Sequence, residues 1–100
     1  MTVRRTSFPS DPFVSSANVL AKAVRAARTQ AKLTMADAAL VANVALQTLV
    51  DVEAGRAGVS IGKLLQIADA LGVSLFVAPA ALREEVRSQI QDTINAGGDE

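Results

Sequence analysis

The sequence predicts an all-α fold of five helices with one short strand near the C-terminal end. Helical spacing of apolar residues, together with helix-capping residues, marks five segments, and only residues 73–77 alternate with period two. Half of the 100 residues are apolar, yet only Phe8, Phe13 and Phe76 are aromatic. We therefore expect one domain whose core consists of Ala, Val, Leu and Ile.

The first helix is expected to follow an extended N-terminal arm. Residues 1–15 lack helical periodicity and contain Pro9 and Pro12, although Val3, flanked by Thr2 and Thr6, leaves room for a short strand. Ser16 is a suitable N-cap for a helix that ends near Gln30. Its apolar stripe consists of Val19, Leu20, Ala23, Val24 and Ala27.

Two short helices come next. Thr34 caps the first, with Asp37 in place of the Glu of a capping box, and Asn43, which tolerates a left-handed backbone, closes it after Ala42. The second runs from Ala45 or Leu46 to Ala54 and stops at Gly55. Their tight connection predicts a helix-turn-helix, in which Ala39 permits close crossing and Val44, Leu49 and Val52 point inward.

The fourth helix is predicted over Ile61–Leu71, between the cap Ser60 and the stop Gly72. Its buried side is expected to contain Leu64, Leu65, Ile67, Ala68 and Leu71.

The predicted strand covers residues 73–77 and ends before Pro79. A lone strand leaves backbone groups unsatisfied, so we expect it to pair with its two-fold copy, because the arm around Val3 is the only other candidate in the chain. The dimer-strand residues are Val73, Leu75, Phe76 and Val77.

A fifth helix, Ala80–Ile94, has a narrow apolar stripe and fits three roles: a dimer helix, a partner-binding helix, or a helix packed back on its own domain. The predicted division is an arm at 1–15, a helix-turn-helix domain with its dimerising strand at 16–78, a C-terminal helix at 79–95 and a flexible tail at 96–100.

The composition excludes several classes of protein. Without His or Cys there is no zinc finger, no iron–sulfur cluster, no Cys nucleophile and no Ser-His-Asp triad, so we expect no enzyme, no metal and no cofactor. The N-terminus has no apolar signal-peptide core, and no uncharged run is longer than Ala38–Val50, which is far shorter than the ~20 residues of a membrane helix. These features predict a soluble, cytoplasmic domain that has no membrane partner.

Charge is distributed unevenly although the net charge is zero. Residues 1–35 contain six bases and one acid, whereas residues 36–100 contain four bases and nine acids. This asymmetry is typical of a chain whose N-terminal part meets a polyanion, and equally of helix faces that differ in charge.

Residues 17–77 resemble the Cro/repressor (XRE-type) helix-turn-helix family, which implies a lambda-repressor-like fold. The segment that ends helix three, Val52-Glu-Ala-Gly-Arg56, and the later Leu64-Leu-Gln-Ile-Ala-Asp-Ala-Leu-Gly-Val73 match the family's motifs, and Leu20, Val24, Arg28, Leu33-Thr34, Ala39, Asn43-Val44 and Leu49 complete the match. The segment that follows Leu71 is similar to HipB-like antitoxin repressors, in which a strand pairs across a dimer.

The resemblance implies roles for particular residues. Arg28 and Glu53 match a structural ion pair between the first and third helices. The base-contacting positions fall at Leu46, Gln47, Thr48, Val50 and Asp51, of which only Gln47 and Thr48 suit base edges; Asp51 would face phosphates unless it reads a cytosine amino group. Met35 stands where the family has a phosphate-binding Gln, and Arg56 stands where it has a Lys or Arg that contacts the DNA backbone.

Further phosphate contacts are expected from the backbone N–H groups of Met35 and Ala36 and from the bases Arg25, Lys32, Arg4 and Arg5. For any one of these bases, a solvated surface charge is the simpler interpretation.

The predicted function is a dimeric, sequence-specific DNA-binding repressor whose partner is double-stranded DNA, and the HipB-like features extend this to an antitoxin with a toxin or other regulatory protein as partner. The alternative is a protein-interaction module, an antiactivator or adaptor that uses an apolar third helix. Leu46, Val50 and Met35 discriminate the two hypotheses. An open position beside basic side chains favours DNA as the partner, whereas a dry patch ringed by acidic side chains favours a protein partner.

Overall fold

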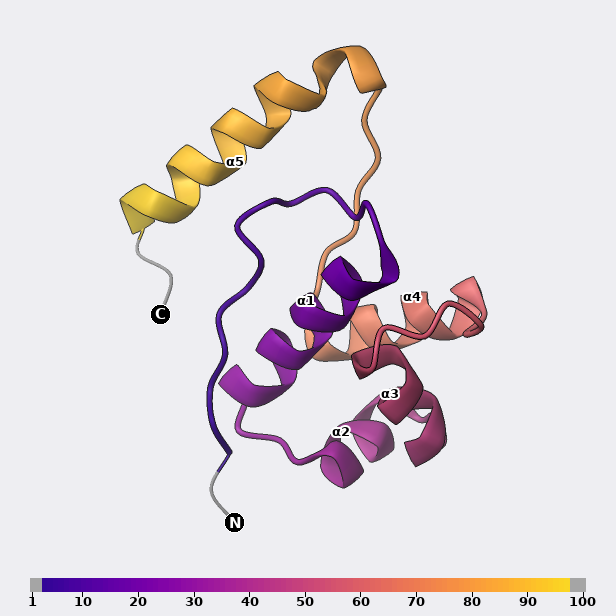
Figure 1. The fold of residues 1–100 in the computed structure, drawn as a ribbon. Coiled ribbons are helices and arrows are strands. Elements are labelled where there is room, and N and C mark those ends of the chain that lie inside the picture. The colour runs from indigo at the N-terminus through magenta and orange to yellow at the C-terminus, as the bar shows by residue number, and fades with distance from the viewer. Residues whose placement is uncertain (1–2, 98–100) are drawn as a thin grey trace.

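The computed structural model describes residues 3–97, which form five α-helices and one 3-10 turn and contain no strand (Figure 1). The order is α1 (Ala17–Gln30), α2 (Met35–Ala42), α3 (Leu46–Glu53), α4 (Ile61–Leu71), η1 (Ala80–Leu82) and α5 (Arg83–Gly97). Helices α1 to α4 pack into what we call the body. The arm (residues 3–15), η1 and α5 form an outer layer beside it.

Local capping sets most of the helix ends, as predicted. The Thr34 hydroxyl accepts a hydrogen bond from the Asp37 N–H (3.2 Å), and the Ser60 hydroxyl accepts one from the Lys63 N–H (3.3 Å). Helix α2 closes on Asn43 in the left-handed region (φ 56°). The prediction for Ser16 is confirmed in its position. It occupies the N-cap of α1, but its side chain makes no capping hydrogen bond, and its carbonyl accepts from the Val19 N–H instead.

The core lies where the four helices of the body meet and consists of small aliphatic side chains. Leu49 is fully buried and Val52 nearly so, and Val44 packs against them partly buried, as the sequence predicts. The prediction that Leu65 lies on the buried side of α4 is wrong, because half of this residue is exposed. The core cluster is Leu20, Val24, Ala38, Ala39, Ala42, Leu49, Val52 and Ile67.

The predicted strand is wrong for this single chain. Residues 73–77 run extended beside the body, and no ladder forms with the arm around Val3 or with any other part of residues 3–97. Period-two alternation gives a segment one apolar face, but a strand also needs a partner for its N–H and C=O groups. Thr2, one of the two threonines that flank Val3 in this candidate strand, lies outside the described residues.

The arm follows α1 in the opposite direction and is fastened to it at Thr6 (Figure 1). The Thr6 N–H donates to Thr29 Oγ1 (3.0 Å), and Gln30 Nε2 donates to the Thr6 carbonyl (2.8 Å). The Thr29 hydroxyl is buried and itself donates to the Arg25 carbonyl, so Thr6 closes a network that α1 begins.

Helix α5 packs back on the arm rather than on the body. Arg87 Nε lies 3.2 Å from Asp11 Oδ1, and Gln91 Nε2 donates to the Ser10 carbonyl (3.1 Å). The predicted tail begins too early, since α5 continues through Gly97; the remaining residues, 98–100, lie outside the described part of the chain.

Within residues 3–97 no single helix is long and apolar enough to cross a membrane; α2 and α3 reach that length and composition only as a pair bent by 112°. The same residues contain no cluster of three or more Asp or Glu side chains that could hold a metal ion.

Candidate nucleic-acid interface

Helices α2 and α3 form a helix-turn-helix. The chain bends by 112° between them, within the usual range for this motif. The left-handed Asn43 makes the turn, and the Val44 N–H returns to the Ala39 carbonyl (3.0 Å). From α4, Gln66 Nε2 donates to the carbonyls of Ala42 (2.8 Å) and Asn43 (3.0 Å), which satisfies acceptors that a helix end leaves open.

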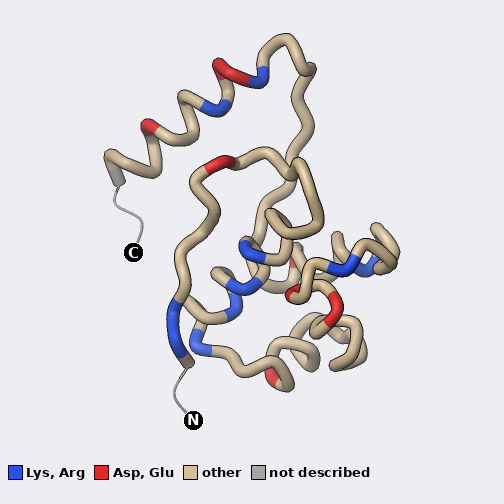
Figure 2. The backbone as a smooth tube through the Cα atoms, viewed as in Figure 1, with Lys and Arg blue, Asp and Glu red and all other residues tan. Residues whose placement is uncertain are grey.

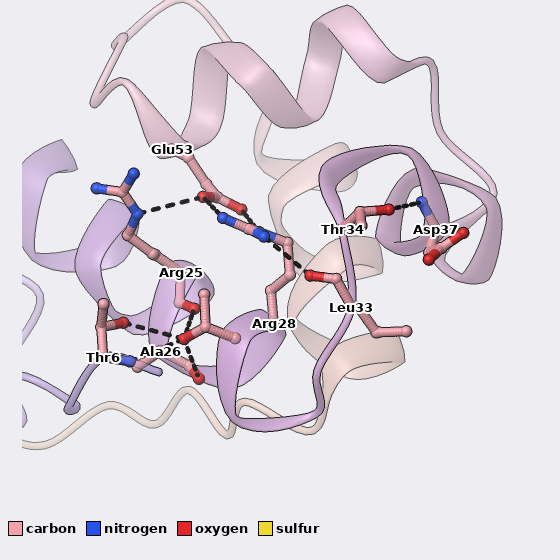
Figure 3. A network of polar contacts seen from close by, with 9 residues as sticks. Thr6, Arg25, Ala26, Arg28, Leu33, Thr34, Asp37 and Glu53 are labelled. Carbon is pink, nitrogen blue, oxygen red and sulfur yellow. Dashed lines mark hydrogen bonds and ion pairs between the residues drawn. The ribbon is translucent and has the colours of Figure 1, made fainter. Parts of the chain in front are cut away.

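A buried ion pair fixes α3 on α1 (Figure 3). Arg28 Nε and Nη2 donate to the two carboxylate oxygens of Glu53 at 2.6 Å and 2.9 Å, and Nη1 donates to the Leu33 carbonyl at 2.9 Å. The two side chains are 9% and 2% exposed. Arg28 and Glu53 therefore join α1, α3 and the turn before α2, which is a structural role.

One groove, of about 730 Å³, opens at the N-terminal end of α3. Bases from two elements line it, Arg4 from the arm and Arg25 from α1, and Met35 and Ala36 bring the start of α2 to the same place. Leu46 completes this wall, with 49% of its side chain exposed. The groove thus combines positive side chains with the N–H groups at a helix start, a combination that suits a phosphate.

A second groove, of about 490 Å³, opens at the other end of α3. Thr48, Asp51 and Arg56 line one side, and Lys63 on the first turn of α4 lines the other. Its shape depends on Gly55, whose positive φ (77°) turns the chain back so that the Arg56 N–H bonds the Asp51 carbonyl (3.0 Å). A Cβ on Gly55 would displace the end of the Asn18 side chain, and the positive φ itself is a backbone conformation that strains any residue with a side chain.

The side chains between the two grooves differ in accessibility. Gln47 is exposed, whereas Thr48, Val50 and Asp51 are half-buried. Gln47 Nε2 donates to Asp51 Oδ1 (2.9 Å), and Arg56 Nε lies 3.5 Å from the same oxygen. Asp51 is therefore occupied by neighbours within this chain.

The structure does not gather every expected phosphate-binding base. Arg5 and Lys32 line neither groove. Lys32 has a left-handed backbone (φ 62°) and belongs to the turn that ends α1.

Lys63 was missed by sequence reasoning. Its signal is a base on the first turn of α4, three residues after the cap Ser60, but only the fold shows that this turn faces Arg56. Thr29 and Gln30, which fasten the arm, were missed as well.

The charge pattern of the arm and α1 differs from that of α5. Positive segments lie on the lower arm and along α1, whereas bases and acids are mixed along α5 (Figure 2). The asymmetry noted in the sequence therefore places positive charge on the side of the body where the arm approaches α3.

A helix-turn-helix with basic grooves at both ends of its second helix defines a class of nucleic-acid-binding domain. The helix-turn-helix family model matches residues 24–77, and the chain belongs to this family of the Cro/repressor (XRE) type, whose members are DNA-binding regulators rather than enzymes. The match is to the family as a whole and does not single out its HipB-like members.

Among solved structures, a chain described as "MDT Protein" superposes with a TM-score of 0.61 at 20% sequence identity, covering 68% of this chain and 96% of its own. At that identity the likeness concerns the fold alone. The comparison with curated sequences finds no match.

Proposed function

We propose that this protein is a homodimeric, sequence-specific DNA-binding repressor that inserts α3 into the major groove. The observation that carries the proposal is the placement of the two basic grooves, which bracket α3 at its two ends. Phosphates flank the major groove on both sides, so a helix lying in it needs positive charge at each of its ends. Such a protein works in the compartment that holds the DNA.

The apolar residues of the reading face favour DNA over a protein partner. Met35 packs partly buried against the core, and Leu46 lies in the groove beside Arg4 and Arg25. Of the two acids on α3, Asp51 is paired with Arg56 and Glu53 is buried against Arg28. A dry apolar patch ringed by acids, which the antiactivator hypothesis requires, is therefore not supported.

Roles can be divided along α3. Gln47 and Thr48 supply direct base contacts, since Gln suits adenine and Thr either a base edge or a thymine methyl, and Leu46 and Val50 add apolar contacts. Arg4, Arg25, Arg56 and the N–H groups of Met35 and Ala36 supply phosphate contacts, to which the grooves add Lys63. Arg5 and Lys32 remain predictions, as they line neither groove.

The dimer is proposed to form through a largely apolar groove of about 670 Å³, which is lined by α4, residues 75–78, the arm at Phe13 and the start of α5 at Arg83 and Arg87. Val77 protrudes beside this groove with 98% of its side chain exposed, next to the half-exposed Phe76 and Leu65. Contiguous exposed apolar surface marks an interface, and a second copy is the occupant that gives two reading helices for two half-sites.

Val77→Asp should give a monomer in sedimentation at concentrations where the wild type is dimeric, because one carboxylate per chain would be buried in the interface. Leu40→Asp is the matched control, since Leu40 is 80% exposed on α2 and does not line the groove. Equal sedimentation of Val77→Asp and wild type would place the dimer contact elsewhere.

DNA binding is tested by selecting preferred sequences from a random duplex pool and measuring affinity at two salt concentrations. Gln47→Ala should lower affinity for the selected site by ~1–3 kcal/mol and leave random-sequence binding almost unchanged. Arg56→Ala should weaken both and reduce the salt slope by about one unit.

Lys22→Ala, which removes an exposed base of α1 that lines neither groove, is the control for charge alone. A pool without any enriched sequence would refute the proposal. Tight site binding that survives both Gln47→Ala and Arg56→Ala would mean that another face meets the DNA.

Nothing in residues 3–97 distinguishes an antitoxin from another repressor of this family, so a toxin partner stays a prediction from the HipB-like resemblance alone.

A further inference from the structure

Asp51 is an unexpected residue to find on the DNA-facing side of α3. A carboxylate there repels phosphates, and its single ionic partner, Arg56, is 67% exposed and already anchored through its backbone. Yet the Asp51 side chain is only 28% exposed, because two neighbours contact the same oxygen, Oδ1. One neighbour is the proposed base-reading residue and the other is a proposed phosphate-binding residue.

We propose that Asp51 is a positioning residue. Its carboxylate orients the Gln47 amide to read adenine, and it holds Arg56 beside α3 until a DNA phosphate replaces the carboxylate as the partner of Arg56. This inference rests on the proposed function and adds a residue that touches no base to the determinants of specificity.

The chemistry of the amide gives the orientation. A carboxylate only accepts hydrogen bonds, so the Gln47 amide must turn its nitrogen toward Asp51 and its oxygen away. The nitrogen carries two hydrogens, and the contact with Asp51 uses one. The proposal requires the hydrogen on the Cγ side of the nitrogen to make this contact, because the other N–H and Oε1 then lie together on the free edge of the amide. That pair matches adenine, which offers N7 as acceptor and the N6 amino group as donor.

Without the carboxylate, Gln47 loses this selection. Its amide can turn over and present its groups in reverse order, and its exposed side chain can sample other rotamers. A side chain fixed before binding also has less conformational freedom to lose, which increases the discrimination that its two hydrogen bonds provide.

Arg56 is held by two contacts from the same residue. Its N–H bonds the Asp51 carbonyl at 3.0 Å, and its Nε lies 3.5 Å from the Asp51 carboxylate. Because Arg56 has to be shared between Asp51 and a phosphate, the carboxylate weakens sequence-independent binding. One residue thereby raises base discrimination and lowers affinity for DNA in general.

Two substitutions separate these effects. Asp51→Asn removes the charge but keeps Oδ1 as an acceptor for the Gln47 amide, whereas Asp51→Ala removes both. Both variants should bind random-sequence duplex more tightly, with a salt slope steeper by up to about one unit, because Arg56 is released to phosphates.

Only Asp51→Ala should lose discrimination. The Gln47→Ala variant first identifies the base pair that Gln47 reads, as the one whose identity this variant no longer distinguishes. The probes are the sequence that the wild type enriches from a random pool and its three single-base variants at that base pair. A good bidentate contact discriminates by about fivefold to a hundredfold. We expect Asp51→Ala to reduce that ratio at least about threefold, Asp51→Asn to retain it, and other base pairs to be unaffected in both.

In the Gln47→Ala background, Asp51→Ala should not reduce discrimination between base pairs any further, since the Gln47 amide that Asp51 orients is absent. Equal discrimination by Asp51→Ala and wild type would overturn the inference and leave the proposed function intact, showing that the carboxylate is only a repulsive surface charge. Equal loss at every base pair would also overturn it, as the mark of a general structural role. A pool that yields no enriched sequence with the wild type would overturn the proposed function and this inference with it.

Discussion

The body and the outer layer are held together by different forces. In the body, α1 to α4 enclose aliphatic side chains such as Val24, Leu49 and Ile67, all at most 1% exposed, and the one buried charged pair has its hydrogen bonds satisfied. In the outer layer no residue of η1 or α5 that the structure describes is buried. Dry packing stabilises the body, whereas contacts at the surface hold the outer layer.

The contacts of the outer layer converge on Phe13. Its ring meets Phe76 edge-on at 5.9 Å between centroids, and the guanidinium groups of Arg83 and Arg87 lie 5.9 Å and 5.4 Å from its centre. Asp11 adds the ion pair to Arg87. These contacts lie at the surface and are weak, so we expect α5 to separate while the body stays folded.

The difference assigns separate tasks to the two ends of the arm. At Thr6 the arm is fastened to the body, which holds Arg4 at the groove beside α3. At Asp11 and Phe13 it is fastened to α5. Loss of α5 should therefore leave the DNA-facing end of the arm in place.

The largest expected effect lies in the body. Arg28→Ala leaves Glu53 buried at 2% exposure without its bidentate partner, and breaking such a pair costs ~3–5 kcal/mol of unfolding free energy. Arg25→Ala is the matched control, because Arg25 is 58% exposed and lies 3.9 Å from the same carboxylate, which predicts less than about 1 kcal/mol. Denaturant unfolding measures both. If the two variants lose equal stability, the body does not depend on this pair.

An intermediate effect is expected in the outer layer. Phe13→Ala removes one aromatic and two cation–π contacts, so the hydrogen-exchange protection of α5 amides should fall about tenfold or more. The amide of the buried Leu49 in α3 should change by less than about twofold. Val14→Ala, at a neighbouring exposed position, serves as control. Equal loss of protection in α3 and α5 would show that the two layers form one cooperative unit.

The body was largely predictable from the sequence because its signals are local. Thr34, Asn43, Ser60 and Gly72 act on residues within four positions of themselves, and the structure places them at helix ends. Leu65 shows the limit of periodicity as a signal. The apolar face predicted for α4 is wider than the surface that the rest of the body covers, so Leu65 remains half exposed.

The extended arm and the fifth helix were predicted, but the contacts of the outer layer were not predictable, because they join residues far apart in sequence. Asp11 meets Arg87, and Thr6 meets Thr29, with no periodicity in the arm to indicate either contact. The strand was predicted wrongly, because alternation of apolar residues indicates that a segment has one apolar face but does not indicate a second strand to which it could bond. At the interface, the four-residue spacing of Gln47 and Asp51 was visible, but the return of Arg56 onto the same carboxylate depends on the backbone of Gly55.

The smallest expected effect is a dependence of the outer layer on pH. The Phe13 N–H and then the Arg87 side chain stabilise the Asp11 carboxylate, which lowers the pKa of Asp11 below its usual value of 3.8. A lowered folded-state pKa means that the contribution of Asp11 is fully present above the usual value and is lost as the pH falls through the lowered one. The pKa of Arg87 is raised, first by Asp11 and then by Glu84, so Arg87 stays charged throughout this range.

Acidification from pH 5 to pH 2 should therefore loosen α5 from the arm while the body remains folded, because Asp11 is exposed to titration and its partners lie in the outer layer. Chemical shifts of Gln91 and Ser10, which share a hydrogen bond, measure the detachment, and those of Leu49 report on the body. Asp11→Asn should make the α5 shifts nearly independent of pH over the same range. If α5 in that variant still detaches on acidification, another carboxylate controls the contact, and the exposed Glu84 beside Arg87 is the first to replace.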